Sequence, residues 1–147
     1  MKKLISLAVL LLFASVAHGQ TAFTGSANDV IAVSSQPTCF PLSPNGPAYL
    51  DNLVCSNQYN TILPTATTFT TWVVTVSQPI AASSSVNFTV EDFTNGNNIA
   101  SCNITAGQTT CTASVSYSAA SGLYVAVKIQ ANSPSAYAIS HVEWGLQ

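Results

Sequence analysis

The four cysteines have the clearest chemistry in this sequence, and their spacing favours disulfides. Cys39 and Cys55 lie 16 positions apart, whereas Cys102 and Cys111 lie nine apart on either side of the turn residues 106–108. No Cys-x-x-Cys spacing occurs, and an all-cysteine zinc site would need two close pairs. Of the three pairings that four cysteines allow, we expect the local one, Cys39 with Cys55 and Cys102 with Cys111. Each bridge would stabilise a small domain by about 3 kcal/mol.

Groups that could catalyse a reaction are few. His141 and Glu143 are two positions apart, so on a strand they share a face where a metal could bind, but no third ligand is in view. Glu91 and Asp92 are adjacent, and on a strand they would point to opposite faces rather than form a coupled acid pair. No serine lies in a Gly-x-Ser-x-Gly context. We therefore expect no catalytic residue, metal or cofactor, and a small secreted hydrolase that uses His141 is the least favoured alternative.

Four tyrosines are the candidate ligand contacts: Tyr49, Tyr59, Tyr124 and Tyr137. Each falls in an expected loop or on the polar phase of an expected strand. Exposed tyrosines stack on sugar rings and anchor protein interfaces. Alternatively they cover strand faces and subunit contacts, which is the commoner role of isolated surface aromatics.

The amino terminus has the pattern of a bacterial secretory signal. Lys2 and Lys3 precede an apolar run over residues 4–14, and small residues follow up to Gly19. The run is too short to span a membrane, and no later segment reaches about 18 consecutive apolar residues. We expect a signal helix that is cleaved before Gln20.

Two segments follow from that cleavage: residues 1–19 are the signal peptide, and residues 20–147 form a single β-sandwich domain. The mature domain is expected outside the cytoplasm, secreted or periplasmic, where disulfides persist. It keeps Lys128 and five acids but no arginine, for a formal charge of 1 − 5 = −4. One lysine cannot neutralise a run of phosphates, which excludes nucleic acid as a partner.

The second half of the chain alternates apolar and polar residues with a period of two, which is typical of strands with one buried face. Turn signals separate the runs, as at Asn95-Gly96-Asn97. The expected strands cover residues 69–76, 86–91, 99–105, 113–117, 123–129 and 137–146. Such a series predicts an all-β fold, an antiparallel sandwich of the jelly-roll kind. The less regular residues 20–68 should add one or two strands and long connections.

The ordered motifs of this half are Trp72–Val76 (WVVTV), Pro79–Ala82 (PIAA), Val86–Val90 (VNFTV), Asn95-Gly96, Cys102–Ile104 (CNI), Gly107–Cys111 (GQTTC), Gly122 and Val142–Trp144 (VEW). Their series resembles small secreted bacterial and phage-type jelly-roll domains, related to tumour-necrosis-factor and complement globular-head modules. The resemblance covers residues 69–147. It implies a binding or structural module that is commonly trimeric, with a disulfide stapling a hairpin, and it implies no catalytic residue. The cysteines and prolines of the first half have no counterpart in it.

These observations together predict an exported, non-enzymatic domain with a structural or adhesive role. Its uncharged Ser- and Thr-rich strand faces lack the charges that keep copies apart, so self-association into a homo-oligomer, a trimer by resemblance, is expected. A surface glycan or protein is the other expected partner. The main alternative is a carbohydrate-binding module that uses the exposed tyrosines.

Overall fold

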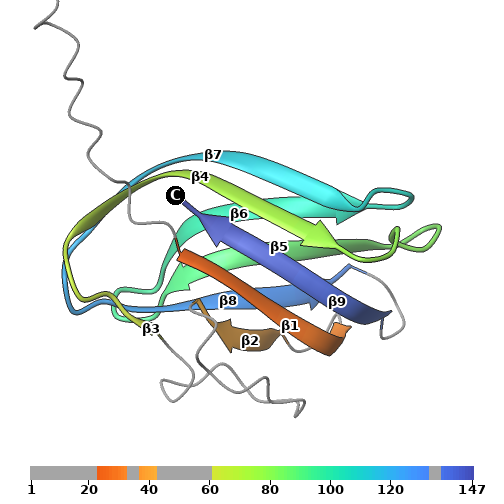
Figure 1. Cartoon of the computed structure of the whole chain (residues 1–147), viewed down its shortest axis with the longest axis horizontal. Helices are drawn as coiled ribbons and strands as arrows, with labels where there is room; N and C mark the ends of the chain where they lie inside the picture. The colour runs from red at the N-terminus through yellow and green to blue at the C-terminus, as the bar shows by residue number, and fades with distance from the viewer. Residues whose placement is uncertain (1–22, 33–36, 43–60, 133–136) are drawn as a thin grey trace, which may run out of the picture.

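The computed structural model describes residues 23–32, 37–42, 61–132 and 137–147. These ranges contain strands and no helix, and they confirm the all-β sandwich (Figure 1). None of the described segments is a helix with the length and hydropathy needed to cross a bilayer. The expected signal helix of residues 1–19 lies outside the described residues. The strands are β1 Phe23–Ala32, β2 Thr38–Pro41, β3 Thr61–Ile62, β4 Thr67–Val76, β5 Ser85–Asp92, β6 Asn97–Thr105, β7 Thr110–Ala119, β8 Tyr124–Ala131 and β9 Tyr137–Leu146.

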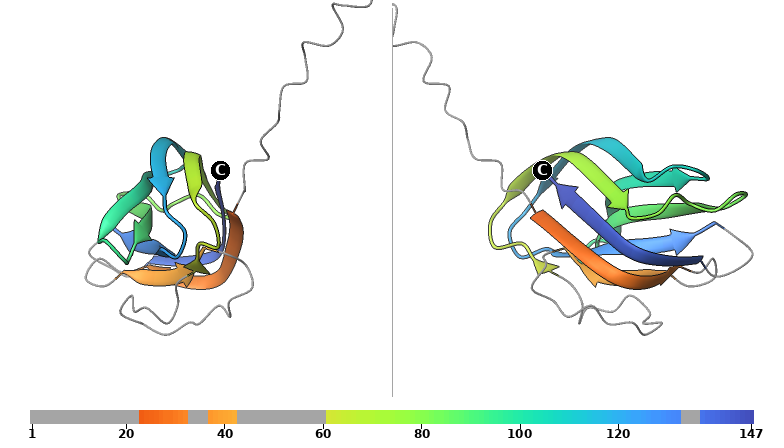
Figure 2. Two further views of the ribbon diagram at one scale, coloured as in Figure 1. Left: turned by 90° about the vertical axis from the view of Figure 1, so that its left-hand side faces the viewer. Right: turned by 45° about the vertical axis from the view of Figure 1, so that its right-hand side comes forward.

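The strands form two antiparallel sheets that pack face to face (Figure 2, left). Sheet A has the order β1-β9-β4-β7, and sheet B has the order β2-β8-β5-β6, with the short β3 also paired to β8. Most connections cross from one sheet to the other. The exceptions are the connection from β5 to β6 and the short β3, which stays with sheet B before the chain crosses to β4. This strand order is that of a jelly roll, in which strands far apart in sequence become neighbours.

The core lies between the sheets and contains the apolar phase of each strand. On β4, Trp72, Val74 and Val76 are buried while the intervening Val73 and Thr75 are exposed. Burial of one phase follows from the alternation of side chains along a strand, and removal of these apolar surfaces from water drives the sheets together. The same inward orientation is confirmed for Val86, Phe88, Val90, Leu123, Val125, Val127, Ile129, Val142 and Trp144.

The two tryptophans are accommodated differently. The Trp144 ring packs against Phe40, with ring centroids 6.0 Å apart, and its indole N–H donates to the Leu42 carbonyl at 3.2 Å. Gly25 on β1 lies under this ring, because a Cβ at that position would come within 2.5 Å of the indole. The buried Trp72 indole N–H has no hydrogen-bond partner among the described residues.

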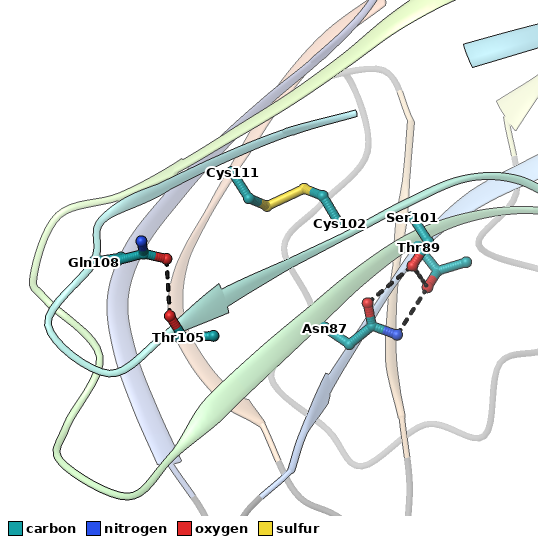
Figure 3. Close-up of a disulfide and its surroundings, with 7 residues drawn as sticks. All are labelled: Asn87, Thr89, Ser101, Cys102, Thr105, Gln108 and Cys111. Atoms are coloured by element: carbon teal, nitrogen blue, oxygen red, sulfur yellow. Dashed lines mark hydrogen bonds between the residues drawn. A yellow bond between two sulfur atoms is a disulfide. The ribbon is translucent and has the colours of Figure 1, made fainter. Parts of the chain in front are cut away.

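The disulfide between Cys102 and Cys111 confirms the expected pairing (Figure 3). Its place corrects the expected hairpin staple: β6 is an edge strand of sheet B and β7 an edge strand of sheet A, so the bridge joins the two sheets. The turn between them is also held by backbone bonds to Ile80, which accepts from Gly107 N–H at 2.8 Å. Cys39 is disulfide-bonded as well; Cys55 lies outside the described residues, so pairing between them stays a prediction.

Candidate functional site

An open groove of about 530 Å³ lies on the outer face of sheet A. Strands β1, β4 and β9 and the C-terminal residue line it, and the lining residues are Thr24, Gly25, Ser26, Val73, Thr75, Glu143, Trp144, Gly145 and Gln147. The groove crosses three neighbouring strands because β9 is paired with β1 on one side and with β4 on the other. The jelly-roll order thus assembles residues that are far apart in the sequence, from β1 and from β9.

Gly145 forms the floor of this groove. It is paired with Thr24 on β1 and with Val73 on β4. These three residues form a row across the strands, and the middle residue of the row has no side chain. Its backbone does not have the positive φ that requires glycine, and a Cβ there would meet only the Thr24 methyl, at 4.0 Å. Glycine inside a strand lowers stability relative to alanine. The space above Gly145 is therefore open without being required by the fold.

The walls of the groove combine hydroxyl groups with one acid and one apolar spot. Ser26 and Thr75 flank Glu143 in the next cross-strand row, and the Glu143 side chain is 68% exposed. Val73 presents its methyl groups at 37% exposure. Hydroxyl groups both donate and accept hydrogen bonds, whereas the ionised carboxylate only accepts. Such a surface suits an uncharged ligand that carries its own hydroxyl groups.

His141 does not line the groove itself but contacts Glu143, which does, and Asn28. Its Nδ1 is 2.6 Å from Asn28 Oδ1, and its Nε2 is 3.1 Å from Glu143 Oε1. The expected shared face of His141 and Glu143 is therefore found, and the ring holds the carboxylate at the edge of the groove. The ring's two partners are an amide and a carboxylate, neither of which is the nucleophile of a catalytic triad. Among the described residues no three His, Cys, Asp or Glu side chains are grouped to hold a metal.

Asp92 is a buried carboxylate that organises the turn between β5 and β6. Its Oδ1 accepts the backbone N–H groups of Thr94 and Asn95, at 2.9 and 3.2 Å. Its Oδ2 accepts from the Asn95 amide at 2.7 Å and from the Tyr117 hydroxyl at 3.0 Å. Asp92 is the last residue of β5, and it is fully buried.

These contacts decide the ionisation of the Asp92–Tyr117 pair. Burial by itself raises the pKa of Asp92, but the hydrogen bonds from Asn95, Tyr117 and Thr94 together hold that pKa below its ordinary value. Burial, followed by the bond to Asp92, raises the pKa of Tyr117. The pair is thus a carboxylate and a neutral phenol at neutral pH, which is the protonation that the turn requires.

On the outer face of sheet B, polar side chains bond to one another (Figure 3). Ser101 Oγ donates to Asn87 Oδ1 at 2.9 Å and lies 3.3 Å from the Thr89 hydroxyl, which is buried. Lys128 is only partly exposed and pairs with Glu91 at 3.2 Å. The polar side chains of this face therefore bond to one another.

The candidate tyrosines are only partly covered by the structure. Tyr124 is 40% exposed and lies opposite Ile62, which is 55% exposed, so the two form an apolar patch at one end of sheet B. Tyr137 begins β9 but its side chain is not among those described, and Tyr49 and Tyr59 lie outside the described residues. Ligand contact by these tyrosines stays a prediction.

The groove was missed by sequence reasoning, which assigned side chains to strand faces without knowing which strands would be neighbours. One signal was available: Gly145 interrupts an alternating strand between the inward-facing Trp144 and Leu146. A lone glycine inside a strand pattern often marks a place where another molecule or backbone approaches. Position 145 could have been selected on that ground.

No protein-family model matches the chain, and no curated protein matches it. The relation to tumour-necrosis-factor-like modules therefore stays a prediction that rests on the motif series alone.

Proposed function

We propose that this protein is an exported adhesive module that binds a surface partner through the groove on sheet A. The observation that carries the proposal is the open space above Gly145. Neither the φ angle nor the packing at this mid-strand position requires a glycine. The hydroxyl groups of Thr24, Ser26 and Thr75 surround that space. A contact function needs such a preformed surface rather than reactive groups.

The favoured ligand is an uncharged glycan. Sugar hydroxyls donate and accept hydrogen bonds, as the groove hydroxyls do, while the Val73 methyl groups offer an apolar spot for the C–H face of a ring. The groove has one charged side chain, Glu143, so binding should change little with ionic strength.

Substitution of Gly145 tests the proposal directly. Gly145→Val fills the groove with a side chain suited to a strand, and we expect it to abolish binding to neutral glycans on an array and in calorimetry while the protein stays folded. Ala138→Val is the matched control, because Ala138 is an exposed residue of β9. An array without neutral-glycan hits, or equal binding by the Gly145→Val variant, would refute the proposal.

A second candidate site for the same ligand class is the patch of Tyr124 and Ile62. Half-exposed tyrosines stack on sugar rings, and the neighbouring Ile62 widens the apolar platform. Tyr124→Ala should then remove glycan binding and Gly145→Val should leave it intact. The reverse result assigns the ligand to the groove, so the two variants separate the candidates.

Export is the remaining part of the proposal. The Cys102–Cys111 disulfide fits an oxidising location. We expect mass spectrometry of the protein recovered from periplasm or medium to find an amino terminus at Gln20. A cytoplasmic protein that retains residues 1–19 would contradict export.

A further inference from the structure

The two sheets leave four edge strands, and these are not equally protected against pairing with another chain. β1 contains Asp29, and β2 has four residues and ends at Pro41. Charges, prolines and short length are the features that keep natural edge strands from pairing. β6 and β7 have nine and ten residues and contain neither a charged residue nor a proline. The unprotected edges thus lie on the same side of the sandwich.

β7 differs from β6 in how well its core-facing residues are covered. On β6, Ala100 and Ile104 are buried. On β7, Ala113, Val115 and Tyr117 remain only partly buried although they pack against the core. An added strand beside β7 would remove that apolar surface from water, which makes β7 the favoured edge.

The hydrogen bonds between β4 and β7 define which backbone groups face the free edge. Val76 N–H donates to the Thr109 carbonyl at 2.8 Å. In an antiparallel ladder the bonded pairs recur every second residue, so the residues between them direct N–H and C=O away from the partner strand. On β7 these outward-directed residues are Thr110, Thr112 and Ser114.

An independent bond on the other side of β4 gives the same assignment. Thr71, the partner of Ser114, exchanges two backbone hydrogen bonds with Gln147, each 2.9 Å long. Thr71 therefore directs its N–H and C=O toward β9 and forms no backbone hydrogen bond with Ser114. The N–H and C=O of Ser114 accordingly point away from β4, toward the free edge. The alternation of exposed and half-buried side chains then continues through Ser116 and Ser118.

We propose that β7 is a strand-addition site and that its occupant is β7 of a second copy of this chain. The two strands pair antiparallel about a twofold axis at Ser114, which joins the two copies of sheet A edge to edge. This places Thr112 opposite Ser116 of the other copy and Thr110 opposite its Ser118. A twofold contact brings identical residues together, so it favours a strand without charges, as β7 is.

The side chains suit this register on both faces. Outer-face hydroxyls would meet hydroxyls, a pairing that sheet A already uses between Thr68 and Ser118 at 3.3 Å and between Ser77 and Ser140 at 2.8 Å. On the inner face, Ala113 would meet Val115 of the other copy. The contact closes on itself and yields a dimer, in place of the trimer that the motif resemblance implies. It is independent of the groove, whose walls belong to β1, β4 and β9.

Sedimentation of the oxidised chain tests the proposal. We expect a dimer at about 100 μM, where micromolar self-association is populated. Ser114→Pro removes the N–H at the axis, and Thr112→Lys with Ser116→Lys introduces edge charges; each should give a monomer whose melting temperature matches that of wild type diluted to its monomeric state. Ala120→Pro, just beyond β7, and Ala138→Lys on β9 are the matched controls that should remain dimeric.

Amide hydrogen exchange supplies a second measurement that does not depend on a variant. The Thr110, Thr112 and Ser114 amides should become more protected as protein concentration rises, whereas the Cys111 and Ala113 amides should be protected at all concentrations. A monomeric wild type, a trimer, or a dimer that survives both edge variants would overturn the proposal. Gly145→Val should stay dimeric, so failure of the glycan proposal would leave this one intact.

Discussion

Two regions on the outer faces of the sheets, the bonded cluster on sheet B and the groove on sheet A, use the same kinds of side chain in opposite ways. On sheet B, the Thr89 hydroxyl is buried among Asn87 and Ser101, and Lys128 is paired with Glu91. On sheet A, Thr75 is exposed and lines the open groove.

The difference has an energetic reason. A hydroxyl that is already bonded to protein neighbours contributes to stability, and loss of its partner leaves a buried group unsatisfied. A hydroxyl that faces water exchanges that water for a ligand group at small net cost. The bonded cluster on sheet B therefore stabilises the fold, whereas the groove on sheet A can present a contact surface.

The largest expected effect on stability comes from removing the disulfide that joins the two sheets. Cys102→Ser combined with Cys111→Ser removes the covalent link between β6 and β7, which closes a sequence separation of nine. The chain-entropy argument predicts a loss of about 3 kcal/mol in the free energy of unfolding, measured by urea denaturation. A loss below about 1 kcal/mol would mean that noncovalent contacts alone hold that side of the sandwich.

The next largest effect is expected at Asp92. Asp92→Asn replaces the oxygen that accepts from Tyr117 and Asn95 with a donor, so we expect a loss of about 2 kcal/mol in urea denaturation. Tyr117→Phe removes one of these bonds and should lower stability by about 1 kcal/mol. Equal stability of wild type and Asp92→Asn would contradict the role of this carboxylate.

Asp92 also predicts how stability changes with pH. Its hydrogen bonds outweigh burial and lower its pKa below 3.8, so the unfolded chain binds this proton at higher pH than the folded protein. The resulting stability is present above the unfolded pKa and is lost as pH falls through the folded one. Melting temperatures recorded between neutral pH and about pH 3 should therefore fall more steeply for wild type than for Asp92→Asn.

A matched pair of threonine substitutions compares the two faces directly. Thr89→Val removes a buried hydroxyl with hydrogen-bond partners and should lower the free energy of unfolding by about 1 kcal/mol. Thr75→Val on the exposed face should stay within about 0.5 kcal/mol of wild type. Similar losses for both variants would remove the distinction between the sheets.

The smallest expected effect is a gain. Gly145→Ala places a methyl group in open space on a strand without positive φ, so it should raise the free energy of unfolding by about 0.5 to 1 kcal/mol. Thermal unfolding measures this gain, and Ala138→Gly, at an exposed position of the same strand, should show the opposite sign. A destabilised Gly145→Ala would mean that the glycine serves the fold and not the groove.

The sequence by itself determined the strands of residues 69–147 and their inward faces. Alternation is a local property: side chains of a strand point to opposite sides, so the apolar phase of Val125 and Val127 identifies the core without knowledge of any partner. The short separation of Cys102 and Cys111 likewise selected their pairing.

Only the tertiary structure decided which strands became neighbours, and with them the groove, the sheet-to-sheet disulfide and the burial of Asp92. Thr24 and Gly145 are paired although they stand at opposite ends of the described chain, because the jelly-roll connections bring β9 between β1 and β4. The choice among long-range pairings depends on how both sheets close over one core. No local pattern in the sequence carries that information.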